Sequence, residues 1–112
     1  MNAHAAAWIT LTLIFAAPRA VAQTPVTPAD RFDRGVRLAT EGDYRAALAE
    51  FRAAFEATQN PEVLFNIAAT HERLNEYVEA EETLLRYERL APPRAFAAHR
   101  ARVVAALARL RA

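Results

Sequence analysis

The sequence predicts a small all-α protein built from stacked helical hairpins, and three observations lead to this prediction. Alanine supplies 28 of the 112 residues and glycine only two, a composition that favours helix over strand. Four short clusters of turn-forming residues divide the chain into segments of helical length. A shift of 33 positions places similar residues on one another. Short connections of this kind join antiparallel helices.

A linker and five helices are expected in order along the chain. Residues 23–28 form the linker, because they hold two prolines and no candidate for a core position. The helices follow at about residues 28–40, 44–58, 61–74, 77–90 and 93–111. Thr27 and Asp43 are expected to cap the first two helices at their N-termini. Gly42 and Asn75 are expected to take the left-handed conformation that ends a helix in a tight turn.

The repeat of 33 residues relates the first two helices to the next two. The shift superposes Gly42 on Asn75, Tyr44 on Tyr77, Ala47 on Ala80 and Phe51 on Leu84. Small residues at Gly35 and Ala47 would let the two helices of the first hairpin approach closely. Phe51 and Leu84 would then fill the two hairpins, with a tyrosine packed at each turn.

With these units in register, the chain resembles tetratricopeptide repeat proteins. The first repeat, residues 29–60, has Gly35, Leu38, Gly42, Tyr44, Ala47, Phe51 and Ala54 at the pattern positions. The second, residues 61–94, has Leu64, Ile67, Ala68, Tyr77, Ala80, Leu84 and Pro92 there. Residues 61–74 are especially similar to envelope-associated members of the family. The resemblance implies a short right-handed solenoid, with residues 95–112 as a C-terminal capping helix.

Four residues depart from the repeat pattern. Arg31 and Arg34 stand where the first repeat usually has large apolar residues. His71 replaces a common aromatic residue, and Tyr87 replaces a common alanine. The packing of the first helix and of the last hairpin is therefore expected to differ from the family's usual packing.

The first 22 residues are expected to be a secretory signal peptide. No charged side chain precedes Arg19, so residues 5–17 form an apolar run that is shorter than the roughly 20 residues needed to span a bilayer. Residues 20–22, Ala-Val-Ala, have the small-x-small pattern of a cleavage site. Cleavage after Ala22 would leave a neutral chain of 90 residues in the periplasm or cell envelope. An uncleaved anchor or a buried helix is the alternative.

The composition and the motifs argue against an enzyme, a cofactor and a metal site. The absence of cysteine excludes thiol catalysis, disulfides and cysteine-ligated zinc. His71-Glu72 begins like a metalloprotease helix motif, but Asn75 stands where the second histidine would be. The chain has no glycine-rich phosphate loop and no nucleophile elbow. Its net charge of +1 argues against a general nucleic-acid binder.

The C-terminal segment is strongly basic. Residues 91–112 hold five arginines and no acidic residue, whereas residues 30–90 carry a charge of −5. One face of the last helix is expected to pack on the preceding repeat through Phe96, Val103, Leu107 and Leu110. The opposite face is expected to carry Arg94, Arg102 and Arg109. The arginines either pair with acidic residues of the preceding helix or bind anionic lipid or nucleic acid.

The resemblance also implies a binding groove, because the first helix of each repeat lines a concave surface in this family. By position, the groove residues are Phe32, Val36, Ala39, Phe65, Asn66, Ala69, Glu72 and Arg73. Asn66 can hydrogen-bond an extended backbone and Arg73 can bind a carboxylate. Phe32 and Phe65 offer apolar anchors unless neighbouring helices cover them. Asp33 replaces an asparagine of the family's chaperone-binding clamp and the chain has no lysine, so that clamp is not supported.

The leading hypothesis is therefore a non-enzymatic protein-interaction module, exported to the bacterial envelope, that binds a partner protein or peptide in this groove. Two repeats and a cap fall short of the roughly three units that usually fold independently. Self-association into a homodimer is therefore a second hypothesis. Peripheral membrane attachment through the arginine-rich helix is a third.

Overall fold

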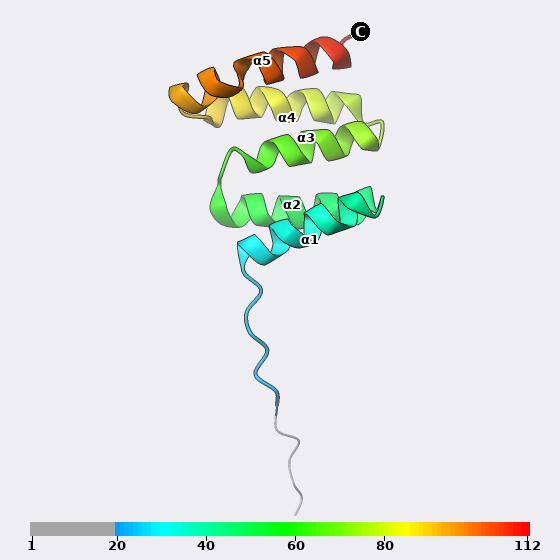
Figure 1. Cartoon of the computed structure of the whole chain (residues 1–112), viewed down its shortest axis with the longest axis vertical. Coiled ribbons are helices and arrows are strands. Elements are labelled where there is room, and N and C mark those ends of the chain that lie inside the picture. The colour runs from blue at the N-terminus through cyan, green and yellow to red at the C-terminus, as the bar shows by residue number, and fades with distance from the viewer. Residues whose placement is uncertain (1–19) are drawn as a thin grey trace, which may run out of the picture.

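The computed structural model describes residues 20–112, which form five α-helices stacked one upon the next (Figure 1). The helices are α1 (Pro28–Thr40), α2 (Tyr44–Thr58), α3 (Val63–Arg73), α4 (Tyr77–Leu90) and α5 (Pro93–Leu110). Successive helices run in opposite directions, and each packs on the one before it. The all-α fold class is therefore confirmed. The expected signal peptide, apart from residues 20–22, lies outside the described residues.

The expected capping residues set the ends of the first helices. The Thr27 hydroxyl accepts the N–H of Asp30 at 3.1 Å, and the Asp30 carboxylate accepts the N–H of Thr27 at 2.9 Å. This capping box begins α1, and its hydrogen bonds hold the pKa of Asp30 below its usual value. The Asp43 carboxylate accepts a backbone N–H of α2 at 3.3 Å. Gly42 (φ 84°) and Asn75 (φ 61°) are both left-handed, as expected.

The connection between α2 and α3 differs from the expectation. The third helix begins at Val63, two residues later than the position of Pro61 suggests. The side chain of Asn60 accepts the N–H of Glu62 at 3.1 Å and so holds these residues in a turn. Gln59 ends α2 in the left-handed conformation (φ 52°), which the sequence did not predict.

The first hairpin is held together by the close approach of Gly35 to Phe51. A Cβ atom at position 35 would come within 2.7 Å of the Phe51 ring, so the space admits only glycine without a shift of the ring. Ala47 is fully buried in the same hairpin. The expected close packing is thus present, but the atoms that face Gly35 belong to Phe51 and not to Ala47.

Tyr87 fills the centre of the second half of the stack. Its side chain is fully buried, and its ring centroid lies 4.3 Å from that of Phe65 and 6.5 Å from that of Phe96. Its hydroxyl oxygen lies 3.3 Å from a carboxylate oxygen of Glu62. Burial, together with the negative charge of Glu62, raises the pKa of Tyr87. One side chain therefore joins α3, α4 and α5 where the repeat pattern usually has an alanine.

Candidate functional site

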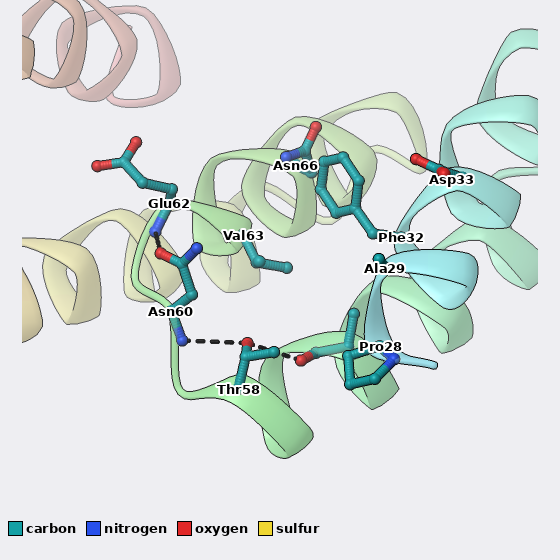
Figure 2. Close-up of a pocket in the computed structure, with 10 residues that line it drawn as sticks. Pro28, Ala29, Phe32, Asp33, Thr58, Asn60, Glu62, Val63 and Asn66 are labelled. Carbon is teal, nitrogen blue, oxygen red and sulfur yellow. Dashed lines mark hydrogen bonds between the residues drawn. The ribbon is translucent and has the colours of Figure 1, made fainter. Parts of the chain in front are cut away.

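Three hollows lie along the side of α3 that faces α1 and α5, and together they form one groove. The first, of about 340 Å³, lies between the beginnings of α1 and α3 (Figure 2). The second, of about 300 Å³, lies between the later parts of the same two helices. The third, of about 230 Å³, lies between α3 and α5. Asn66 lines the first and second hollows and Ala69 the second and third, so the hollows adjoin one another. We refer to them as the α3 groove.

All the residues that the sequence suggested for a groove line these hollows. The first hollow has Phe32 and Asn66, the second has Val36, Ala39, Asn66, Ala69 and Arg73, and the third has Phe65, Ala69 and Glu72. The structure therefore brings them to one side of the stack. That they bind a partner stays a prediction.

The first and second hollows, on the α1 side, form the open half of the α3 groove. Val36 is 42% exposed and Ala69 is also exposed. The Phe32 ring is half-buried, with its centroid 5.5 Å from that of Phe51. The amide group of the Asn66 side chain forms no hydrogen bond with another residue between 20 and 112, and it lies beside Phe32 (Figure 2). This half offers apolar walls and one amide.

The third hollow, on the α5 side, is the closed half of the groove. Phe65 is only 9% exposed, because Tyr87, His99 and Arg102 surround its ring. The ring centroid of His99 lies 5.3 Å from that of Phe65, and the Arg102 guanidinium carbon lies 4.7 Å from it. Phe65 is thus covered by neighbouring side chains, so it does not provide the apolar anchor that the sequence suggested.

The arginines of α5 close this half, which corrects the expectation that Arg102 and Arg109 point away from the repeats. The Nε and Nη2 of Arg109 donate to the two carboxylate oxygens of Glu72 at 2.7 and 2.9 Å. This bidentate pair holds the pKa of Glu72 below its usual value and raises that of Arg109. The expected pairing with α4 occurs at Arg111, whose Nε lies 2.6 Å from a Glu81 oxygen.

Arg73, at the far end of the open half, is held by Tyr44, the first residue of α2. Its Nε and Nη2 donate to the hydroxyl of Tyr44 at 2.9 and 2.6 Å, and its guanidinium carbon lies 5.1 Å from the ring centroid. Tyr44 therefore packs at its turn as expected. Tyr77 is 49% exposed and donates a hydrogen bond to the Asn75 side chain at 2.8 Å. Arg73 remains exposed and keeps donors for a carboxylate.

The order of the helices and the continuous groove along α3 agree with a comparison to known families. A model of the tetratricopeptide repeat matches residues 38–110, which is more than half of the chain. The chain belongs to the tetratricopeptide repeat family. No curated protein and no solved structure matches it. The match reaches through α5, so the helix that was expected to cap the solenoid falls within the matched repeat region.

Tetratricopeptide repeats generally mediate protein–protein interaction, and the family is generally non-enzymatic. Between residues 20 and 112, no group of three histidine or acidic side chains is placed to hold a metal ion. None of the helices in this part of the chain has the length and apolarity needed to cross a membrane.

A polar network centred on the buried His71 lies outside the groove and joins the two repeats. His71 is 3% exposed, with Nδ1 at 2.7 Å from a Glu76 oxygen and Nε2 at 3.4 Å from Nη2 of Arg52. Both contacts are satisfied if Nδ1 carries the proton and donates to Glu76, while Nε2 accepts from Arg52. The hydrogen bond from His71, followed by that from Arg45, holds the pKa of Glu76 below its usual value. His71 thus packs as a structural residue of the repeat.

Proposed function

We propose that this tetratricopeptide repeat protein binds an extended segment of a partner protein in the open half of the α3 groove. The observation that supports this proposal is the position of Asn66 between two adjoining hollows, where its side-chain amide forms no hydrogen bond within residues 20–112. Its side-chain amide has one acceptor and two donors, which match the N–H and C=O groups of a peptide backbone. Val36 and Phe32 supply apolar surface on the α1 side.

Binding of this kind needs no chemistry beyond shape and hydrogen bonding. Asn66 and Ala69 lie on α3, whose position is fixed by buried contacts of Leu64, Ile67 and Ala68 in the core. Because α3 is held rigidly, binding would cost less conformational entropy than binding to a mobile surface. A partner segment would lie along the groove between α1 and α3, with apolar side chains in the two hollows.

The proposal is tested with the full chain as bait in an extract of the cells that produce it. Ala69→Arg places a long side chain in the middle of the groove, and Asn66→Ala removes the amide; neither position is needed by the core. Arg89→Ala, on an exposed part of α4, serves as the control. We expect a partner that the native chain and the control retain and the two groove variants lose. A partner retained by all four chains would contradict the proposal.

We also propose that the protein is exported to the bacterial envelope and is cleaved after Ala22. Support comes from the apolar run at residues 5–17 and from the small residues at positions 20 and 22. The mass of the protein recovered from producing cells should correspond to a chain beginning at Gln23. Replacement of both Ala20 and Ala22 by leucine should leave the segment attached. A native chain that keeps residues 1–22 would contradict export by this route.

Homodimer formation and membrane attachment stay predictions from the sequence. Of the five arginines in residues 91–112, Arg102, Arg109 and Arg111 already contact side chains of α3 or α4. Arg94 and Arg100 form no such contact within residues 20–112, and both are exposed. Arg94 and Arg100 could therefore contact an anionic lipid surface without loss of the contacts that close the third hollow.

A further inference from the structure

The first hollow of the open half has an apolar floor and an acidic rim. Ala29 and Phe32 of α1 face Val63 of α3 across it. Two carboxylates stand at its edge, Asp33 from α1 and Glu62 from the turn before α3. Figure 2 shows them on opposite sides of the Phe32 ring. The residues that line the hollow include no arginine and no histidine.

No arginine of α1 forms an ion pair with the two carboxylates of this rim. Arg31 and Arg34 both reach Glu50 of α2, each at an N–O distance of 3.6 Å. These two positions usually hold large apolar residues in the repeat, and here they form ion pairs with the second helix of the hairpin. Arg37, one helical turn after Asp33, is exposed and forms no ion pair with that carboxylate.

The two carboxylates of the rim differ in what they contact. One Glu62 oxygen lies 3.3 Å from the Tyr87 hydroxyl and the other 3.5 Å from Nε2 of His99, so Glu62 is already bound to the second half of the stack. Asp33 is exposed and forms neither an ion pair nor a side-chain hydrogen bond with another residue between 20 and 112. A carboxylate in that position attracts a cationic group and repels an acidic one.

We infer that the partner segment carries an apolar side chain that fills the first hollow and, close to it, a lysine or arginine that pairs with Asp33. This inference rests on the proposed function and adds its specificity. Arg73 lies at the other end of the open half, so the groove is acidic at one end and basic at the other. The segment therefore lies in one direction, with its cation at Asp33 and any carboxylate towards Arg73.

The test begins with a phage-displayed library of random 12-residue peptides, selected on the full chain. We expect the enriched peptides to share a lysine or arginine next to an aliphatic or aromatic residue. A synthetic peptide with that consensus should bind Asp33→Lys about tenfold more weakly or worse, because like charges would then meet at the rim. The same peptide with glutamate in place of its cation should bind Asp33→Lys more tightly than it binds the native chain.

The matched control is Glu88→Lys, which makes the same charge change at an exposed position of α4 outside the groove. Its affinity for the consensus peptide should remain near the native value. Enriched peptides that lack cations, or an affinity that Asp33→Lys leaves unchanged, would overturn the inference and leave the groove as the binding site. Absence of enrichment, or peptides whose binding Ala69→Arg does not reduce, would overturn the proposed function itself.

Discussion

Along the groove, α3 has one helix on each side, α1 and α5. The side towards α1 is open, whereas the side towards α5 is closed. On the open side, α1 lines the hollows with Ala29, Phe32, Asp33, Val36 and Ala39, and none of these side chains forms a hydrogen bond or ion pair with α3. On the closed side, α5 presents Arg102 and Arg109, which reach across to Phe65 and Glu72. The comparison teaches that a groove between stacked helices stays open only where the side chains at its edge do not bond to the neighbouring helix. Helix order alone does not decide whether it is open.

The largest loss of stability is expected from Tyr87→Ala, which removes the buried ring at the centre of the second half of the stack. Loss of a fully buried aromatic ring should lower the free energy of unfolding by about 3–5 kcal/mol, as for other large-to-alanine changes in cores. Urea unfolding followed by circular dichroism measures it. Tyr87→Phe keeps the ring and should cost only about 1 kcal/mol, because it removes a hydrogen bond alone. Equal losses for the two variants would show that the hydroxyl, and not the ring, holds this side together.

A smaller effect is expected on the open side, from Gly35→Ala in the first hairpin. The new Cβ atom would lie 2.7 Å from the Phe51 ring. Overpacking of this kind costs about 1–3 kcal/mol and alanine regains about 1 kcal/mol in helix propensity, so a net loss of up to about 2 kcal/mol is expected. Urea unfolding of Gly35→Ala, of Phe51→Leu and of the double variant completes the measurement. The double variant should lose less than the sum of the single losses, because leucine makes room for the methyl group. Additive losses would show that the methyl group meets no resistance from the ring.

The smallest effect is expected from Arg109→Gln, which opens the closed side without touching its core. The pair with Glu72 is largely exposed, so its removal should lower the free energy of unfolding at pH 7 by about 0.2–1 kcal/mol. The effect depends on pH because the pKa of Glu72 lies below its usual 4.5 in the folded protein. The stabilisation is fully present above pH 4.5, the usual pKa of a glutamate. It is lost as the pH falls through the lower pKa that Glu72 has in the folded protein.

Thermal unfolding of the native chain and of Arg109→Gln at pH 7 and at about pH 3 checks the sign of this dependence. The difference in Tm between the two chains should narrow in acid. Arg94→Gln, which removes an exposed arginine without a partner in residues 20–112, should show no such narrowing. A difference that stays constant with pH would mean that Arg109 acts through packing and not through its pair with Glu72.

The helices and most of their ends could be predicted because they are set by residues close in sequence. Thr27, Asp43, Gly42 and Asn75 each act within a few residues, so the sequence shows both the signal and its target. Gln59 was missed because a left-handed glutamine carries no such local signal.

The sequence predicted which residues line the groove, but not which of them are covered by neighbouring side chains. Positions in the repeat indicate which residues of α3 face outwards from the hairpin, and all of them line the α3 groove. The angle of a residue around α5 does not indicate which neighbour it meets, because an arginine side chain can reach past the edge of its own helix. Arg102 and Arg109 do so, and Arg102 buries Phe65 together with Tyr87 and His99.

Glu62 belongs to both sides of this comparison, since it stands at the rim of the first hollow and also contacts Tyr87 and His99. A ligand that drew its carboxylate into the open half would have to weaken those two contacts. Thermodynamic reciprocity then requires that whatever loosens α5 alters the affinity for such a ligand by the same factor. Through this one side chain, such a ligand would be coupled to the packing of α5 against the start of α3.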